Sequence, residues 1–277
     1  MTASQTSDLT ALIPELITLA EAAGEAIMEV YKSEDFGTTA KADDSPLTKA
    51  DLASNNVIIE GLTRLTPDIP VLSEESKHLP YSERKAWTRF WLVDPLDGTK
   101  EFIKQNGEFT VNIALIEGDK PVIGVVYAPA IKLTYWAAEG LGAFRGAGQD
   151  APLRADDYES GTINLVASRS HAGPETEALI ESLKRDVEVE IISIGSSLKF
   201  CLVANAQAHI YPRFGPTMEW DTAAAQCVVE GAGGKVRAPD GETLRYNKEN
   251  LLNPHFIVTR SDLLFKRAVE FDQQPTK

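Results

Sequence analysis

The stretch WLVDPLDGTKEF, residues 91–102, contains the two aspartates on which the prediction of the fold depends. It places Asp94 and Asp97 three residues apart, at the end of an apolar run that is typical of a buried strand. Pro95 fixes its own φ angle and bends the chain, so both carboxylates can point into one site. The same residues also occur in ordinary surface turns. This stretch alone is therefore compatible with either a turn or a metal-phosphate site.

The residues beside the two aspartates favour the metal-phosphate site. The backbone carbonyl of Leu96 can face the same cation, and Gly98 lets the backbone approach a ligand closely. If a helix begins at Thr99, the N–H groups of Gly98 and Thr99 face a phosphate. The Thr99 hydroxyl can then orient an attacking water. This interpretation requires further carboxylates elsewhere in the chain.

Two other places put carboxylates at the end of a predicted element. Glu74 and Glu75 follow the apolar run IPVLS, and Asp221 follows MEW at the start of a helical pattern. Strands that end side by side would bring the first pair close to Asp94, where like charges repel and a bound cation is the natural remedy. Oxygen ligands without nearby Cys or His indicate Mg²⁺ or Mn²⁺ rather than zinc. Taken singly, a Glu pair fits a solvated face and a Trp-Asp pair fits a helix N-cap, so only the combination indicates a metal site.

The composition limits the partners. The 277 residues are 43% hydrophobic and 25% charged, which is ordinary for a soluble globular protein. The net charge of −14 argues against a nucleic-acid polymer as partner, but bound divalent cations would still let a small phosphorylated ligand bind. No apolar run reaches the roughly 18 residues that span a bilayer, so no integral membrane segment is expected. The N-terminal residues lack a secretory pattern, and Cys201 and Cys227 form no disulfide framework, which predicts a cytoplasmic protein with two buried free thiols.

Alternating helical and strand patterns predict a mixed α/β fold built in layers. Helical spacing predicts helices, the first with Pro14 in its first turn, at residues 9–32, 50–67, 174–185, 196–207 and 220–234. Strand-like runs lie at residues 69–76, 89–99, 109–118, 121–130, 132–140, 163–168, 189–194 and 209–214. A glycine-rich stretch and a polar stretch after it predict two domains. They are an N-terminal α+β domain with most of the metal ligands, residues 1–155, and a C-terminal α/β domain with Asp221, residues 156–277.

The acidic segments resemble the three signature segments of the inositol monophosphatase-like superfamily, which contains lithium-sensitive, Mg²⁺-dependent phosphomonoesterases. They are LSEES (72–76), WLVDPLDGTKEF (91–102) and EWDTAAAQCVVEGAGG (219–234). The resemblance runs from about residue 10 to 260 and implies a layered αβαβα sandwich. Further stretches resemble the CysQ-type 3′(2′),5′-bisphosphate nucleotidases in particular: SPLTKAD (45–51), DPLDGTKEFIKQNGEFTVNIALI (94–116), GVVYAPA (124–130), SIGSSLKFCLVA (193–204) and YPRFGPT (211–217).

The resemblance implies a set of metal ligands. Glu74, Asp94 and the Leu96 carbonyl would hold one Mg²⁺, and Asp94, Asp97 and Asp221 would hold a second, with Asp94 bridging. Glu74 would share a weaker third ion, and Mn²⁺ would substitute for Mg²⁺. Two cations about 4 Å apart can stabilise both the attacking and the leaving oxygens of an in-line displacement.

The resemblance also implies the reaction and its other residues. The family removes the 3′-phosphate of 3′-phosphoadenosine 5′-phosphate, giving AMP and phosphate. Asp51 and Thr99 match the pair that positions the attacking water, so the catalytic residues would be Asp51, Glu74 and Thr99. The implied substrate contacts are Glu74, Leu96, Asp97, Gly98, Thr99, Ser196, Lys199, Arg213 and Asp221.

The residues proposed to recognise the nucleotide carry less specific signals. Ser196 and Lys199 share a helix face, and Lys199 and Arg213 fit a second phosphate or the ribose, although each cation also fits an ordinary solvated side chain. Arg169 and His171 are further candidates. Lys100 and Glu101 favour the nucleotidase branch of the family, because simple inositol monophosphatases tend to have uncharged residues at these positions.

Three functions remain to be separated. The leading one is the bisphosphate nucleotidase, with 3′-phosphoadenosine 5′-phosphosulfate as a second candidate substrate that the residues do not rank. The alternatives are an inositol or sugar monophosphate phosphatase with the same metal core, and a non-catalytic protein that binds divalent cations. The sequence leaves open whether the chain is a monomer or a homodimer. Some bacterial family members associate peripherally with the cytoplasmic face of the inner membrane, but no basic amphipathic helix here supports it independently.

Overall fold

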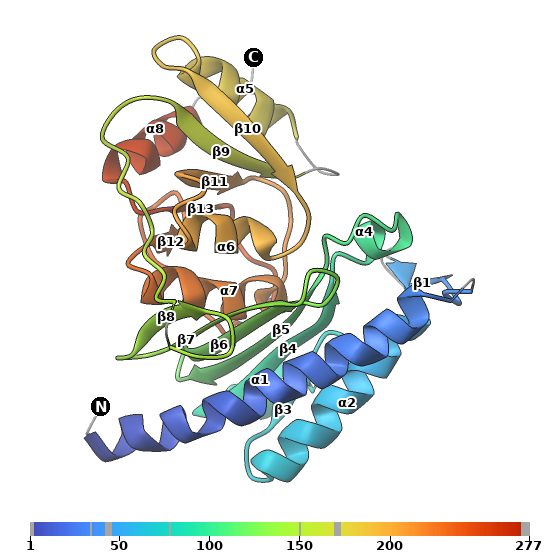
Figure 1. The fold of residues 1–277 in the computed structure, drawn as a ribbon. Helices are drawn as coiled ribbons and strands as arrows, with labels where there is room; N and C mark the ends of the chain where they lie inside the picture. Colours follow the sequence, from blue (N-terminus) through green and yellow to red (C-terminus); the bar gives the residue numbers. More distant parts are fainter. Residues whose placement is uncertain are drawn as a thin grey trace.

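The fold is a stack of five layers in which helices and sheets alternate (Figure 1). The computed structural model describes residues 3–33, 35–41, 46–77, 79–149, 151–168 and 173–272. Three apolar clusters lie between successive layers, so each sheet face is covered by helices. The predicted mixed α/β sandwich is confirmed. No helix within the described ranges is both long and apolar enough to cross a membrane.

The outer helical layer of the first half consists of α1 (Ala3–Tyr31) and α2 (Lys49–Leu65), which pack along one face of a six-stranded sheet (Figure 1). The prediction that Pro14 lies in the first turn of the first helix was wrong, because α1 begins eleven residues earlier, at Ala3. Pro14 is exposed, so the carbonyl that loses its hydrogen-bond donor can face water, which explains why the helix continues through it.

The six-stranded sheet has the order β3-β4-β5-β6-β7-β8. All its neighbours are antiparallel except β3 and β4, which run in parallel. The strands are β3 (Val71–Ser73), β4 (Arg89–Asp97), β5 (Thr110–Glu117), β6 (Lys120–Ala128), β7 (Leu133–Ala138) and β8 (Gly142–Arg145). The parallel pair matters for the site, since the two strands end at the same edge of the sheet.

The middle helical layer consists of α6 (Leu198–Ala204) and α7 (Glu219–Gly231). Helix α7 lies directly on the six-stranded sheet, mainly against β5, β6 and β7. A Cβ atom at Gly124 of β6 would lie 2.3 Å from the carbonyl oxygen of Ala224, so only glycine permits this approach. The close packing fixes the height of α7, and with it Asp221, above the sheet.

The second sheet has five strands in the order β10-β9-β11-β13-β12. The strands are β9 (Ile163–Ser168), β10 (Val189–Ile194), β11 (Ile210–Arg213), β12 (Lys235–Arg237) and β13 (Phe256–Thr259). Its outer face is covered by α5 (Pro174–Leu183) and α8 (Asp262–Asp272). The remaining short elements are α3 (Tyr81–Arg84), α4 (Thr99–Ile103), β1 (Thr39–Ala40) and β2 (Pro46–Leu47).

The two sheets lie in the two halves of the sequence, at residues 71–145 and 163–259. The middle layer joins them, because α7 belongs to the second half and packs on the first sheet. The division into domains at residues 155 and 156 stays a prediction. The expectation of two buried thiols is confirmed, since Cys201 and Cys227 are both free and buried, and burial raises the pKa of each.

Candidate active site

The DPLD segment is a bulge within a strand rather than a turn. Strands β4 and β5 pair regularly as far as Asp94 opposite Asn112 and resume at Asp97 opposite Thr110. Strand β4 therefore advances three residues while β5 advances two, and the backbone N–H of Leu96 donates to Asp94 Oδ1 at 3.0 Å. A bulge is one of the few places inside a sheet that tolerates proline, and it re-aims the side chains that flank it.

Gly98 joins this bulge to α4, which begins at Thr99, the helix start on which the phosphate interpretation depended. The φ angle of Gly98 is +95°, in the region that residues with a Cβ rarely adopt. A Cβ there would lie 3.0 Å from the carbonyl oxygen of Glu108 and 3.3 Å from Cβ of Ser196. Glycine is therefore required both by the backbone conformation and by the neighbours.

Three carboxylates from separate elements converge at this edge of the sheet. Glu74 follows β3, and its backbone N–H donates to the carbonyl of Val93, which sets it beside Asp94. One oxygen each of Glu74, Asp94 and Asp221 lies within 4.8 Å of the others. Burial, together with the neighbouring carboxylates, raises the pKa of both Asp94 and Asp221 well above the usual range.

Asp221 and Asp51 are held in the same way, each in the first turn of a helix. Asp221 Oδ2 accepts the backbone N–H of Met218 at 2.8 Å, at the start of α7. Asp51 Oδ2 accepts from the backbone N–H and the hydroxyl of Thr48 at 2.7 and 2.6 Å, at the start of α2. In each carboxylate, a second oxygen remains to face the site, and the helix start favours a negative charge.

Asp51 and Thr99 form a hydrogen-bonded pair. The Thr99 hydroxyl lies 3.1 Å from Asp51 Oδ1 and 3.3 Å from the carbonyl oxygen of Leu96. Asp51 is 1% exposed, and this burial raises its pKa despite the hydrogen bonds from Thr48 and Thr99. The sequence motif SPLTKAD is thus brought next to the DPLDGT segment, 48 residues away.

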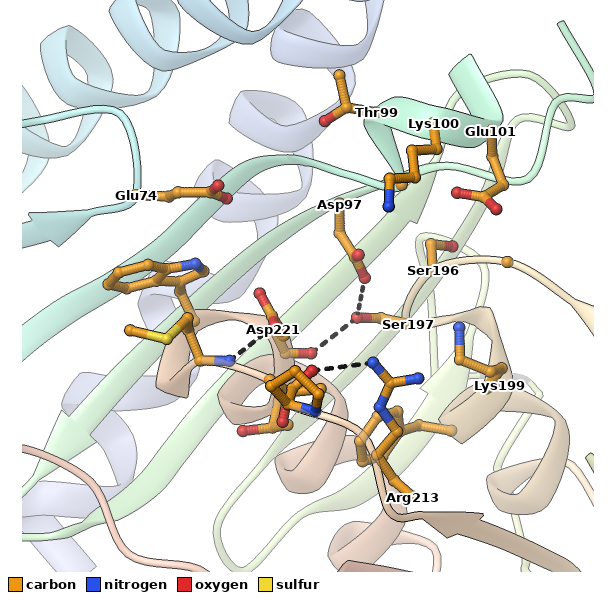
Figure 2. A pocket seen from close by; sticks show the side chains of 18 of the residues that line it. Glu74, Asp97, Thr99, Lys100, Glu101, Ser196, Ser197, Lys199, Arg213 and Asp221 are labelled. Carbon is orange, nitrogen blue, oxygen red and sulfur yellow. Dashed lines mark hydrogen bonds between the residues drawn. The ribbon is translucent and has the colours of Figure 1, made fainter. Parts of the chain in front are cut away.

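Asp97 is held by a contact that sequence reasoning missed. Its Oδ2 accepts from the hydroxyl of Ser197 at 2.7 Å, and the same hydroxyl oxygen accepts from Asn112 Nδ2 at 2.9 Å. Figure 2 shows the Ser197 hydroxyl between Asp97 and Asp221, joined to each by a hydrogen bond. A serine just before a helix is normally interpreted as an N-cap, so the sequence carried no signal for this contact.

Lys41 is a second residue that sequence reasoning missed. Its ammonium group forms ion pairs with Glu74 and Glu75, with Nζ 2.6 Å from Glu74 Oε1. Burial alone would lower the pKa of Lys41, but the two carboxylates raise it. Glu75 is therefore part of an ion pair rather than of the three-carboxylate cluster, and no local sequence pattern links it to a lysine 34 residues away.

A pocket of about 430 Å³ opens beside these carboxylates (Figure 2). Asp97, Thr99 and Asp221 lie on one side of it, and Lys199 and Arg213 lie on the other, as Figure 2 shows. The remaining lining residues are Glu74, Gly98, Lys100, Glu101, Gly195, Ser196, Ser197, Phe200, Tyr211, Pro216, Thr217, Met218, Trp220, Thr222 and Leu252.

The two cations are held differently. Lys199 is 8% exposed, with Nζ 5.8 Å from the centre of the Tyr211 ring. Burial, with a further contribution from Arg213, lowers the pKa of Lys199 to about 8. The Arg213 guanidinium donates to the carbonyl of Pro216 at 2.9 Å, while its buried Nε has no hydrogen-bond partner among the described residues.

Ser196 lies just before the N-cap residue of α6, in a strained backbone conformation. Its φ angle is +50°, which costs about 1–3 kcal/mol for a residue with a Cβ. Such residues cluster at binding sites, and Ser196 lines the pocket next to Gly98. The weaker candidates Arg169 and His171 lie outside the described residues.

The donor set fits divalent cations. The cluster offers carboxylate oxygens from Glu74, Asp94 and Asp221, with the Leu96 carbonyl close by. The Lys41 ammonium forms its ion pairs with Glu74 and Glu75. Hard oxygen donors without thiol or imidazole are the ligands that Mg²⁺ and Mn²⁺ prefer. A bound cation would also offset the burial and the repulsion that raise the pKa of Asp94 and Asp221.

Residues 8–270 match the inositol monophosphatase family. The chain belongs to this family. It is 52% identical over 250 residues to the 3′(2′),5′-bisphosphate nucleotidase CysQ of Salmonella typhimurium, covering 90% of this chain and 99% of the relative. It is 49% identical to the protein of the same name from Escherichia coli K12, over the same shares. The crystal structure of CysQ from Bacteroides thetaiotaomicron matches with a TM-score of 0.80 and 46% identity, covering 92% of this chain and 97% of that one.

Proposed function

We propose that this protein is a 3′(2′),5′-bisphosphate nucleotidase that hydrolyses the 3′-phosphate of 3′-phosphoadenosine 5′-phosphate and releases AMP. The observation that carries the proposal is a single pocket with a carboxylate cluster on one side and the cations Lys199 and Arg213 on the other (Figure 2). A substrate with two phosphates could use both sides at once. Similarity to nucleotidases at about 50% identity over nearly the whole chain supports the same activity.

The proposed metal ligands are the acidic side chains of the cluster and one backbone carbonyl. Asp94 would be shared by two Mg²⁺ ions, and the other ligands would be Glu74, the Leu96 carbonyl, Asp97 and Asp221. When bound, the ions supply the positive charge that stabilises the transferred phosphoryl group. A third ion at Glu74 and replacement by Mn²⁺ belong to the same proposal. The Lys41 ion pair to Glu74 would have to loosen before an ion binds there.

Asp51 and Thr99 are the proposed water-positioning pair. The Thr99 hydroxyl is fixed between Asp51 Oδ1 and the Leu96 carbonyl, so its oxygen has a defined direction in which to take a proton from a water while its own proton passes to Asp51. Burial raises the pKa of Asp51, which makes the carboxylate a better proton acceptor than an exposed one. The amides of Gly98 and Thr99, at the start of α4, would hold the phosphate that is cleaved.

Lys199, Arg213 and Ser196 are the proposed contacts for the second phosphate and the ribose. Placing a buried ammonium and a guanidinium in a pocket is costly unless an anion pairs with them. The buried Arg213 Nε without a partner among the described residues, and the lowered pKa of Lys199, support an anion as the missing partner. A polyol monophosphate would give them no partner, which favours the nucleotide.

Product analysis tests the proposal. The protein should be incubated with 3′-phosphoadenosine 5′-phosphate and Mg²⁺, and the products should be identified by phosphorus NMR and chromatography. AMP and one equivalent of phosphate are expected. Release of the 5′-phosphate, or no release at all, would contradict the proposed function. The same assay with 3′-phosphoadenosine 5′-phosphosulfate shows whether a sulfated 5′ end is also accepted.

A further inference from the structure

The hydroxyl of Ser197 is the point at which three separate elements meet. It lies 2.7 Å from Asp97 Oδ2, at the end of β4, and 3.0 Å from the backbone oxygen of Asp221, in α7. It accepts from Asn112 Nδ2, in β5, at 2.9 Å. Its partners at Asp97 and Asn112 are 100 and 85 residues away in the chain, so these contacts join the two halves of the molecule.

Ser197 is not a helix cap, although its position predicts one. Ser197 occupies the N-cap position of α6, where a serine normally accepts a hydrogen bond from an amide of the first helical turn. Its side chain makes no such bond. The hydroxyl turns instead toward the acidic cluster (Figure 2), where it is 1% exposed. Its orientation is therefore set by the cluster and not by the helix start.

The contacts also fix the direction of the proton. Asn112 Nδ2 donates to Ser197, which leaves the serine proton for one of its two acceptors. Asp97 Oδ2 is both the closer acceptor and the charged one, and such bonds are the stronger ones. Asn112 also lies 3.5 Å from the same Oδ2, so both donors hold this oxygen of Asp97.

We propose that Ser197 is a positioning residue for the metal ligands: its hydroxyl fixes the Asp97 carboxylate against the start of α7, which carries Asp221. Because Ser197 begins the helix that carries Lys199, the same contact sets the phosphate-binding cation at a fixed distance from the cluster. The inference rests on the proposed metal-dependent function and adds a residue that acts through a metal ligand rather than as one.

The test is the affinity for Mn²⁺ and Mg²⁺, measured by calorimetric titration without substrate. Ser197→Ala should bind the ions about 10–100-fold more weakly than the wild type, the usual effect of losing a partner of a metal ligand. Ser261→Ala is the matched control, because Ser261 is also 1% exposed but lies at the start of α8. It should bind as the wild type does. Wild-type affinity in Ser197→Ala, or equal losses in both variants, would overturn the inference.

A second variant keeps the test independent of folding. Asn112→Ala removes the donor to Ser197 and should weaken metal binding by a smaller factor, with kcat for both variants recovering at saturating Mg²⁺. Unchanged affinity in Asn112→Ala would contradict the positioning network even if Ser197→Ala failed to fold. A wild-type protein that bound no divalent ion would refute the proposed function itself, whereas wild-type binding with unaffected variants would refute only the role of Ser197.

Discussion

The hydroxyl of Thr99 donates to Asp51 Oδ1 across 3.1 Å, and this bond links the start of α4 to the start of α2. The bond ties the DPLDGT bulge to a helix of the outer layer, in a place where Asp51 is already held by Thr48. A protein that only stored a cation would have no need for a hydroxyl fixed in this way. The pair therefore supports catalysis over passive cation binding.

Thr99→Val should lower kcat strongly while leaving the fold intact. Valine keeps the shape of threonine but removes the hydroxyl that holds a water, and a positioned proton acceptor typically contributes about 10²–10⁴-fold. The KM should change by only a few-fold, because the amide groups at the start of α4 remain. Thr99→Ser should retain most of the activity. Equal kcat values for the wild type and Thr99→Val, in steady-state assays, would contradict the role of this pair.

Metal removal should lower the stability of the protein. Burial and the neighbouring carboxylates raise the pKa of Asp94 and Asp221. Without a cation these carboxylates repel one another, so chelation should abolish turnover and lower the unfolding temperature. At about 100 times its dissociation constant an ion adds ~2.7 kcal/mol, which corresponds to about 5 °C or more. Thermal scans with chelator and with added Mg²⁺ measure this. An unfolding temperature independent of Mg²⁺ would contradict the metal site.

The affinity for the bisphosphate should weaken above about pH 8. Burial lowers the pKa of Lys199 to about 8, so its ammonium is charged below that pH and loses its charge as the pH rises through it. The KM for 3′-phosphoadenosine 5′-phosphate should therefore rise on the alkaline side. Lys199→Met should raise the KM at pH 7 by about 10-fold or more, the effect of losing a hydrogen bond to a charged group.

The pH dependence supplies the control for this prediction. In Lys199→Met the alkaline rise in KM should be absent, because the group that titrates is gone. If the variant kept the same rise, the titrating group would be a different one. The measurement is a set of KM values between pH 6.5 and 9.5 for both proteins at saturating Mg²⁺.

Gly124→Ala should destabilise the protein and weaken metal binding together. The added Cβ would meet the carbonyl of Ala224 at 2.3 Å and push α7, which carries Asp221, away from the sheet. Overpacking of this kind costs about 1–3 kcal/mol or more. Gly118→Ala is the control, since its Cβ would meet nothing within 4 Å, although its positive φ adds some strain. Urea unfolding and metal titration should show both losses in Gly124→Ala and no loss of metal affinity in Gly118→Ala.

The sequence predicted most accurately those features of the fold that depend on local residue patterns and on where strands end. The runs before Glu74 and Asp94 predicted two strands ending together, and β3 and β4 do run in parallel to that edge. The start of α4 at Thr99 was only a condition of the phosphate interpretation, because the strand-like run was predicted to continue to residue 99. The short strands β8, β12 and β13 were missed, because glycines obscure the first and the other two are too short to show a period.

What the sequence could not predict depends on contacts between distant segments. Lys41 reaches Glu74 and Glu75 from a segment in which neither a helix nor a strand was predicted. The serine proposed from the sequence was Ser196, yet its neighbour Ser197 makes the contacts to Asp97 and Asp221. A helix-start serine has the same local pattern whether its hydroxyl caps the helix or turns away from it, so only the packing of α6 on the sheet distinguishes the two.

The most direct test of the proposed function compares three substrates with Mg²⁺: 3′-phosphoadenosine 5′-phosphate, AMP and inositol 1-phosphate. The cations across the pocket from the carboxylate cluster predict the highest kcat/KM for the bisphosphate, because only it places a phosphate at each side. Lys199→Met should reduce that preference and leave the slower hydrolysis of inositol 1-phosphate nearly unchanged. A wild-type protein that preferred inositol 1-phosphate would contradict the proposal that this pocket recognises a nucleotide bisphosphate.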